Sequence, residues 1–371
     1  MSYRFLEYEL PKERIAQQPA VRSGERSDAR LLYALRQDAT GGLRISDRWV
    51  RDLPELLRAG DLLVLNDSRV RPARFFIKLP GSDTEAEVLL LDRCGAAAGD
   101  GSGAWEALAR PMRRFKEGLQ LPLSAHIAAT VLGRSDDGSK LRLHLAPSSL
   151  DEAKTLDTLI ESEGSMPIPG YIRDGVADRE DSDFYQTVFA RELGSVAAPT
   201  AGLHFTLPLL QALSDRGVEH EFLTLHVGLA SFAPVRDVDS HQMTNERYHI
   251  SSRCLDAINR TKARGGRVVV VGTTATRALE SAALAEPALF SGEQIATDGV
   301  GGRTELMIRP GFKFQVVDLL MTNFHQPLTT HLLLVAAFIG EQEIEQIYQH
   351  ALQGAYRFLS YGDSMLLERR E

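Results

Sequence analysis

The chain contains few cysteines and no long hydrophobic run, and each shortage excludes a class of protein. Only two cysteines, Cys94 and Cys254, occur among 371 residues, too few for a disulfide framework or a cysteine-based metal site. The longest apolar stretch, residues 332–340, is much shorter than the roughly 18 residues that a membrane span requires. The N-terminus carries charges where a secretory signal would be apolar. The sequence therefore predicts a cytoplasmic protein without a membrane segment.

Positive charge is also in deficit, because 42 Lys and Arg residues face 50 Asp and Glu residues, for a net charge of -8. Such a balance argues against indiscriminate binding of nucleic acids, which depends on cations that replace counterions on phosphates. Two segments, 68–80 and 109–118, are nevertheless locally basic. They are either solvated strand edges, which often carry cations, or contacts for RNA. The candidate RNA-binding residues in them are Arg69, Arg71, Arg74, Arg110, Arg113, Arg114 and Lys116.

The pattern of elements changes along the chain. Between 72 and 150, short alternating strands are separated by turn clusters, which is typical of a small β-barrel or sandwich. After residue 150, helical and strand patterns alternate, which indicates a mixed α/β fold. The first seventy residues resemble this later part. We therefore predict an α/β catalytic domain formed by 1–71 and 151–371, into which a small β-barrel domain, 72–150, is inserted.

Polar loops follow several predicted strands, at the places where α/β sheets usually bind ligands. The buried strand 268–271 enters a Gly-Thr-Thr turn and then a helix that contains Arg277. The turn lacks the glycines of a dinucleotide site, and its threonines have a competing structural explanation as helix caps. The strand 316–321 enters a loop with Asn323 and His325, followed by an apolar helix that ends at Gly340.

Histidines recur in loops marked by glycine or proline. His204 immediately precedes a predicted helix that starts near Leu207, and His226 and His325 each follow a predicted strand. A single histidine of this kind more often makes a structural hydrogen bond than it catalyses. Three together can supply an acid, a base and hydrogen-bond donors near neutral pH. No metal is expected, because His-Glu-x-x-His and similar ligand spacings are absent from the sequence.

Long motifs in the chain resemble one known family. The strings "GDLLVLNDSRVRPARF", "GSVAAPTAGLHFT", "HVGLASFAPV", "VVVVGTTATRALES", "VDLLMTNFHQP" and "YRFLSYGDSMLL" occur in the same order in the S-adenosylmethionine:tRNA ribosyltransferase-isomerase family of queuosine biosynthesis. The resemblance covers nearly the whole chain. It implies a two-domain enzyme with a β-barrel inserted into an α/β domain, in agreement with the organisation predicted above.

The resemblance also implies a reaction. The ribosyl part of S-adenosylmethionine is transferred and isomerised onto the aminomethyl group of a deazaguanine base at the tRNA wobble position, which gives epoxyqueuosine and releases adenine and methionine. The implied partners are S-adenosylmethionine and a tRNA with a GUN anticodon, and the chain is expected to act as a monomer. S-adenosylmethionine is a co-substrate, and no metal or redox cofactor is required.

Residue chemistry suggests roles for the polar groups in this reaction. His204 suits a base or proton donor, Asn323 and His325 suit adenine or ribose hydroxyls, and the Gly-Thr-Thr turn with Arg277 suits the methionine carboxylate or a phosphate. The candidate catalytic residues are His204, His226 and His325. The candidate substrate-binding residues are Asn66, Thr200, Thr273, Thr274, Arg277, Asn323, Tyr361 and Asp363.

The chain departs from the family pattern near these residues. The departures are Leu328 for a lysine, Ala230 for a glycine, Thr244 for a histidine and Arg303 for a tryptophan. Leu328 removes a cation, for which Arg303 is a candidate replacement. Two alternatives therefore stay open beside the family reaction. One is a diverged paralogue that uses S-adenosylmethionine on another nucleoside or small molecule, and the other is a noncatalytic RNA-binding relative.

Overall fold

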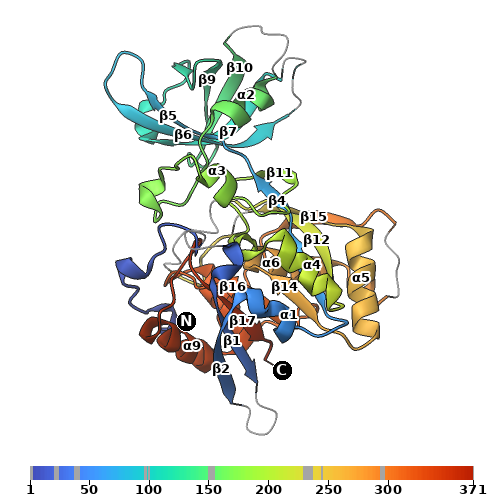
Figure 1. The fold of residues 1–371 in the computed structure, drawn as a ribbon. Helices are drawn as coiled ribbons and strands as arrows, with labels where there is room; N and C mark the ends of the chain where they lie inside the picture. The colour runs from blue at the N-terminus through green and yellow to red at the C-terminus, as the bar shows by residue number, and fades with distance from the viewer. Residues whose placement is uncertain are drawn as a thin grey trace. The chain divides into compact units, whose positions relative to one another are not determined.

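The computed structural model describes residues 3–20, 25–36, 42–95, 98, 101–148, 155–228, 237–243, 245–292 and 297–370. The chain divides into two compact units, each described separately below (Figure 1). The larger unit comprises Met1–Arg69, Tyr171–Asp174 and Phe184–Glu371. The smaller unit comprises Val70–Gly170 and Gly175–Asp183.

A nine-stranded mixed sheet forms the centre of the larger unit. Its strands, in spatial order, are β15 (Val300–Thr304), β13 (Glu246–Ile250), β12 (Glu219–Leu225), β3 (Leu62–Asn66), β14 (Val268–Val271), β16 (Leu319–Asn323), β17 (Ser364–Glu368), β1 (Arg30–Arg36) and β2 (Leu43–Trp49). The neighbours β12, β3, β14 and β16 run parallel. Their carboxyl ends therefore lie at one edge of the sheet, where the polar loops follow.

Helices cover both faces of this sheet because its strands are apolar on both sides. Along β3, Leu62 and Val64 pack into one hydrophobic cluster, whereas Leu63 and Leu65 pack into another. Such continuous apolar strands are typical of parallel sheets buried on both faces. The first cluster includes residues of α5 (Ser252–Ala263), α6 (Thr273–Ala285), α8 (Thr330–Ile339) and α9 (Glu341–Gln353). The second includes residues of α1 (Leu53–Leu56) and α4 (Leu207–Asp215).

The smaller unit is built on a six-stranded antiparallel sheet, nearly closed into a barrel-like shape. Its spatial order is β5 (Arg74–Lys78), β6 (Glu85–Cys94), β7 (Gly103–Arg110), β10 (Leu141–Pro147), β9 (Ile127–Arg134) and β8 (Gln120–Pro122). Helix α2 (Leu156–Glu163) packs onto this sheet through Leu156, Leu159 and Ile160. The unit thus extends past the predicted boundary at residue 150, because these apolar side chains complete the core of the sheet.

The α/β fold class predicted from the sequence is confirmed. The start of α4 also agrees with its sequence, since Thr206 accepts a hydrogen bond from the Leu209 backbone and Pro208 lies in the first turn. Helix α8 ends where predicted, at Gly340, whose φ of 116° favours glycine. Turn residues in the sequence thus mark where the helices around the site begin and end.

Candidate functional site

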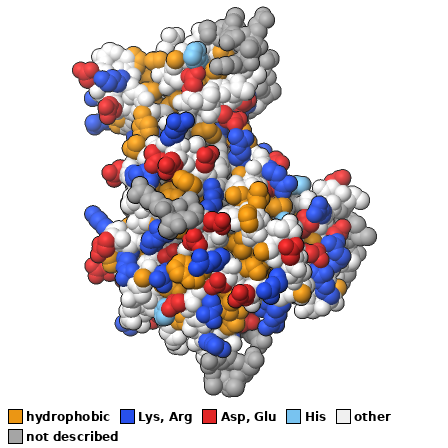
Figure 2. Space-filling model, in the orientation of Figure 1, with side chains coloured by type: hydrophobic (Ala, Val, Ile, Leu, Met, Phe, Trp, Pro, Cys, Tyr) orange, Lys and Arg blue, Asp and Glu red, His pale blue; other side chains and the backbone are white. Residues whose placement is uncertain are grey.

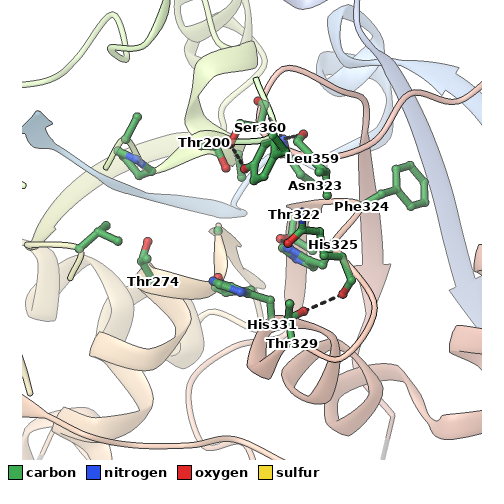
Figure 3. A pocket seen from close by; sticks show the side chains of 18 residues that line it. Thr200, Thr274, Thr322, Asn323, Phe324, His325, Thr329, His331, Leu359 and Ser360 are labelled. Carbon is green, nitrogen blue, oxygen red and sulfur yellow. Dashed lines mark hydrogen bonds between the residues drawn. The ribbon is translucent and has the colours of Figure 1, made fainter. Parts of the chain in front are cut away.

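A pocket in the larger unit lies where the carboxyl ends of β14 and β16 meet, beside the segment 198–201 (Figure 3). Its polar lining comes from the end of β16 and the loop after it, from the first residues of α6 and α8, and from the segments around residues 171, 200 and 360. The polar side chains that line it are Tyr171, Thr200, Thr273, Thr274, Thr322, Asn323, His325, Gln326, Thr329, His331 and Ser360. Five of them, Thr200, Thr273, Thr274, Asn323 and His325, were predicted from the sequence.

Gly272 allows the chain to turn from β14 into α6 at the pocket wall. Its φ is 92°, and it occupies the N-cap position of α6 without any side-chain capping bond. The alternative that the threonines are helix caps is therefore wrong for this turn. Thr274 instead contacts Asn66, whose Nδ2 lies 3.3 Å from Thr274 Oγ1. Asn66 also donates to the Leu225 carbonyl at 3.0 Å, so it ties together the ends of β3 and β12 and the start of α6 from behind the pocket.

Asn323 is held in one orientation by its neighbours. Its Nδ2 donates to the carbonyls of Leu359 at 2.8 Å and Ser360 at 3.2 Å. Both hydrogens of the Asn323 amide are used in these bonds, so Oδ1 can only accept. The Nε2 atom of His204 lies 3.2 Å from Oδ1, and we therefore assign the ring hydrogen to this nitrogen. Burial lowers the pKa of His204 to about 4, which keeps the ring neutral at pH 7. His204 lies behind Asn323 and is not among the residues lining the pocket.

His325 faces the pocket from a clamped backbone. Its N–H donates to the Tyr348 hydroxyl at 2.8 Å, and its carbonyl accepts from the Tyr8 hydroxyl. Its Nε2 lies 2.9 Å from Thr322 Oγ1. The ring stacks on His331, with centroids 5.0 Å apart and planes inclined by 17°. These contacts fix the position of one imidazole within the pocket.

Both stacked histidines are neutral at pH 7. Burial, and then the neighbouring His331, hold the pKa of His325 well below its usual range. Burial, and then Arg277, lower the pKa of His331 to about 4. A neutral imidazole can accept a proton, which is what a general base requires. His331 is not among the residues predicted from the sequence, because the helix after Pro327 is apolar apart from the polar side chains of its first turn.

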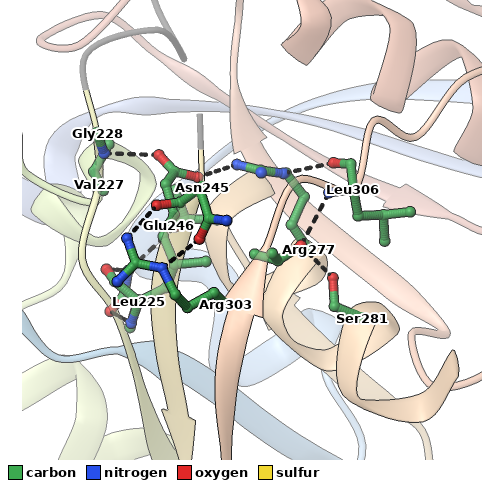
Figure 4. A network of polar contacts seen from close by, with 12 residues as sticks. Leu225, Val227, Gly228, Asn245, Glu246, Arg277, Ser281, Arg303 and Leu306 are labelled. Atoms are coloured by element: carbon green, nitrogen blue, oxygen red, sulfur yellow. Dashed lines mark hydrogen bonds and ion pairs between the residues drawn. The ribbon is translucent and has the colours of Figure 1, made fainter. Parts of the chain in front are cut away.

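Arg277 and Glu246 form a buried ion pair beside the pocket (Figure 4). Arg277 is 5% exposed; its Nη1 contacts the Glu246 carboxylate and its Nε donates to the Leu306 carbonyl at 2.9 Å. Within the described part of the chain, its Nη2 is buried without a hydrogen-bond partner. A second, smaller cavity, which Arg277 lines together with Met243 and Met307, shares Thr273 and His331 with the pocket.

The remaining predicted residues support the pocket from outside. Asp363 is 2% exposed and accepts backbone N–H groups of Arg30 at 2.9 Å and Arg357 at 2.7 Å. It thereby fixes the turn that supplies the Leu359 and Ser360 carbonyls. Tyr361 is buried too, and His226 lies one residue before Val227, which does line the pocket.

Tyr171 and Ser360 contribute to the pocket but were not predicted from the sequence. The Tyr171 hydroxyl lies 2.7 Å from Ser360 Oγ, and both side chains line the wall next to Asn323. Ser360 belongs to the motif "YRFLSYGD", which carried the family resemblance. Its place in that motif could have identified Ser360 as a site residue. Tyr171 follows no predicted strand, so the sequence offered no such indication for it.

The predicted RNA-binding residues differ in how much of each side chain is available. In the smaller unit, Arg71 bonds Asp157 at 3.0 Å, and Arg74 donates to the carbonyls of Ile168 at 2.8 Å and Gly175 at 2.7 Å. These two cations serve the unit's own structure. The exposed members of the set are Arg69, Arg110, Arg113, Arg114 and Lys116. On the face of the larger unit seen in Figure 2, positive and negative side chains are interspersed.

Two of the departures from the family pattern can be placed. Leu328 is 39% exposed, with a φ of 57°, and is not among the lining residues. Arg303 is exposed and bonds Asn245 through both Nε and Nη2, and it does not line the pocket either. It is therefore unsuited to replace the missing lysine. Ala230 and Thr244 lie outside the described residues.

Neither a metal site nor a membrane-spanning helix is found among the described residues. Among them, no group of three or more His, Cys, Asp or Glu side chains is arranged to hold a metal ion. No helix in the described ranges has the length and apolar character needed to cross a membrane.

Comparisons with known proteins match nearly the whole chain. The family model described as "Queuosine biosynthesis protein" matches residues 3–367. The chain is 44% identical to the S-adenosylmethionine:tRNA ribosyltransferase-isomerase of Azoarcus sp. (strain BH72), over 100% of this chain and 99% of the relative. It is 46% identical to the protein of the same name from Aromatoleum aromaticum, over 98% and 96%. The crystal structure of S-adenosylmethionine tRNA ribosyltransferase from Thermotoga maritima is similar, with a TM-score of 0.52, 32% identity and coverage of 98% and 99%.

Proposed function

The chain belongs to the queuosine biosynthesis protein family, and we propose that it catalyses the reaction for which its relatives are named. It transfers and isomerises the ribosyl group of S-adenosylmethionine onto the 7-aminomethyl-7-deazaguanine base at the wobble position of tRNA. The products are epoxyqueuosine-containing tRNA, adenine and methionine. The observation that carries the proposal is the match along the whole chain, combined with a polar pocket at the ends of parallel strands.

His325 is the residue best suited to accept a proton in the pocket. The sulfonium of S-adenosylmethionine acidifies the adjacent ribose carbon, so a neutral imidazole is a sufficient base for that step. Its backbone is fixed on both sides by tyrosine hydroxyls, which favours a defined geometry. His204 acts through Asn323 by holding the amide oxygen in place, and Asn323, Thr200 and Ser360 hydrogen-bond the nucleoside part of the co-substrate.

The methionyl end of the co-substrate binds at Arg277. Nη2 of this residue is buried and unpartnered within the described chain, so it has a hydrogen-bond capacity that a carboxylate would satisfy. Thr273, at the N-terminus of α6, adds a hydroxyl beside the positive end of the helix dipole. Met243 and Met307 offer apolar contacts to the methylene groups between this carboxylate and the sulfonium.

The tRNA partner carries a GUN anticodon, and its phosphates contact the exposed cations Arg69, Arg110, Arg113, Arg114 and Lys116. The chain acts as a cytoplasmic monomer and needs no cofactor besides the co-substrate. Asn66, Tyr361 and Asp363 shape the site by supporting its loops from behind.

The deciding assay incubates the purified protein with S-adenosylmethionine and a tRNA that carries the aminomethyl-deazaguanine base. Mass spectrometry of the digested tRNA detects epoxyqueuosine, and chromatography detects adenine. The His325→Ala variant is the inactive control, and Cys94→Ala, which changes an exposed side chain of the smaller unit, is the matched active control.

Epoxyqueuosine formation by the wild-type protein and by Cys94→Ala supports the proposal. Release of adenine without modification of the tRNA favours the paralogue that acts on another acceptor. A folded protein that binds tRNA but produces neither product contradicts the enzymatic function and favours the noncatalytic RNA-binding relative.

A further inference from the structure

The smaller unit contains a groove that the function described so far does not use. It has a volume of about 720 Å³ and lies over β5, β6 and the end of β7. Its walls include Phe76, Lys78, Arg110, Pro111 and Val176. A groove of this size is within the range of sites that hold a small organic group.

Two large apolar side chains in this groove are exposed to water. Phe76 is 54% exposed and Val176 is 56% exposed. On β5, Phe75 and Ile77 point into the core, so Phe76 and Lys78 point outward together. An exposed aromatic ring in a concave surface commonly marks a binding site, whereas single exposed apolar residues need no explanation.

Cations border the ring, and two acids, Glu85 and Glu87, also line the groove, with Glu85 opposite Lys78 in the sheet register. In the sheet register, Phe76 faces Glu87 on β6, which in turn faces Arg110 on β7. Glu87 is already paired with Arg74 at 3.0 Å. Arg110 is exposed, and no ion pair or hydrogen bond to its side chain is found in the described part of the chain.

More positive charge follows Arg110 along the chain. Arg113 and Arg114 lie in the single turn of 3-10 helix after Pro111, and Lys116 comes two residues later. All three are exposed, and Glu117 is the one acid in the segment 109–118. The groove therefore has a largely apolar lining, and a predominantly basic segment continues along the chain from Arg110 and Pro111 in its wall.

We propose that this groove binds an unpaired base of the tRNA substrate, which stacks on Phe76 while Arg110 and Lys78 contact the flanking phosphates. The inference rests on the proposed function, since it takes tRNA as the ligand. Proteins that bind unpaired nucleotides combine aromatic side chains, on which bases stack, with cations that follow the backbone. A purely apolar partner would leave the exposed Arg110 without a counterpart.

The test measures the dissociation constant of the full-length protein for the substrate tRNA at several salt concentrations. Loss of one stacked base weakens binding by roughly 5- to 150-fold, so Phe76→Ala should show a loss in that range with an unchanged salt dependence. Phe76→Trp keeps a stacking ring and should bind as well as the wild type. Arg110→Gln should weaken binding and reduce the slope of log Kd against log salt by about one.

Leu132 provides a matched control, because it is 46% exposed on β9 of the same sheet but does not line the groove. Leu132→Ala should leave tRNA binding unchanged. Binding of S-adenosylmethionine alone, measured by calorimetry, should be the same in all variants, and thermal melting checks that each is folded.

Equal tRNA affinity of Phe76→Ala and the wild type would overturn the proposal while leaving the proposed function intact, provided that the wild type modifies tRNA. A wild-type protein that neither binds nor modifies tRNA would overturn both. A shift in self-association of Phe76→Ala on sedimentation, with unchanged tRNA affinity, would assign the groove to a second copy of the chain instead.

Discussion

His204 Nε2 lies 3.2 Å from Asn323 Oδ1, and this contact joins segments that are 119 residues apart in the sequence. The amide nitrogen of Asn323 is committed to two backbone carbonyls, so the histidine is the donor that completes the set. We therefore expect His204, which the sequence suggested as a catalyst, to act as a positioning residue, because it contacts Asn323 and does not line the pocket. Its effect on the reaction depends on Asn323, which reaches the pocket directly.

Replacing His204 should lower activity when the new side chain has no N–H group to donate to Asn323 Oδ1. His204→Leu leaves the buried Asn323 oxygen unsatisfied, a cost of about 1–3 kcal/mol that allows the amide to turn. We expect kcat/KM for S-adenosylmethionine to fall by roughly 5- to 150-fold. His204→Gln retains an N–H donor and should recover most of the loss. Steady-state kinetics of both variants test this, and an unimpaired His204→Leu enzyme would show that Asn323 needs no such support.

Acid should destabilise the protein partly through His204. The pKa of this group is lowered to about 4 in the folded chain because of its burial, against 6.5 for an ordinary histidine. As the pH falls below 6.5 the unfolded chain takes up the proton first, so the stability contributed by this group is lost between pH 6.5 and pH 4. At pH 5 the loss amounts to about 2 kcal/mol.

Urea unfolding of the wild type and of His204→Gln at pH 7 and pH 5 measures this contribution. The difference between the two pH values should be smaller in the variant by about 2 kcal/mol. His144→Gln, which changes an exposed residue of β10, is the control and should behave as the wild type. An identical pH dependence in all three proteins would mean that His204 is not the group that titrates.

Much of the site could be predicted from the sequence because the strand ends are local features. An apolar strand followed by a polar turn identifies the loops at residues 66, 272 and 323 without knowledge of the fold, and parallel pairing brings them to one edge. What the sequence could not distinguish is whether a polar side chain faces the pocket or supports it from behind. His325 and His204 look alike in this respect, yet only His325 lines the pocket.

The missed residues depend on long-range packing. Tyr171 lines the pocket through its hydrogen bond to Ser360, 189 residues away, and no periodic pattern encodes that contact. The extension of the smaller unit past residue 150 has a similar cause, because the apolar face of α2 is needed to complete a core formed by earlier strands. Local signals thus predicted elements and loops, whereas tertiary contacts decided which side chains meet.

His331 should influence the pH dependence of the reaction through His325. The two rings are stacked with centroids 5.0 Å apart, and His331 contributes to the lowering of the pKa of His325. His331→Gln leaves the effect of burial, which is the larger cause, and removes the contribution of His331, so the pKa of His325 should rise part of the way toward its usual value. We expect the acid limb of the kcat/KM profile to move to higher pH. An unmoved limb with normal activity would show that His325 does not act as the base.

Removing one member of the Arg277–Glu246 ion pair should destabilise the larger unit more than removing both charges. Arg277→Met leaves the Glu246 carboxylate, which is 2% exposed, buried without this cation, although the Gly228 N–H still donates to it. Such a loss typically costs about 3–5 kcal/mol. Adding Glu246→Gln to the variant removes the stranded charge and should restore part of the stability while substrate binding stays weak. Urea unfolding of the two single variants and the double variant measures the coupling energy of the pair. If the double variant loses as much stability as the two single variants together, the prediction is wrong.

A second measurement separates the binding role of Arg277 from this structural one. The wild-type enzyme should bind decarboxylated S-adenosylmethionine at least tenfold more weakly than S-adenosylmethionine, because the analogue leaves Nη2 of Arg277 without its acceptor. Competition assays with the unmodified protein avoid any folding defect. Equal affinity for the two molecules would place the carboxylate elsewhere.

Leu328 is the departure from the family pattern whose reversal should change substrate binding most. The side chain is 39% exposed and follows the loop that holds His325, and its backbone N–H donates to the Leu6 carbonyl at 3.0 Å. A lysine at this position keeps its ammonium in water and experiences the same positive φ as leucine, so Leu328→Lys should change the free energy of unfolding by less than about 0.5 kcal/mol.

If an anionic substrate group passes this position, the added cation contributes a charged hydrogen bond of about 1.5–3 kcal/mol. That contribution is present before the chemical step, so KM should fall roughly 10- to 100-fold with kcat unchanged. KM measured separately for S-adenosylmethionine and for tRNA identifies which substrate carries the group, and Leu328→Gln, which has a polar side chain without charge, is the control. If neither KM responds to the lysine, the loss of the cation at Leu328 has no consequence for binding.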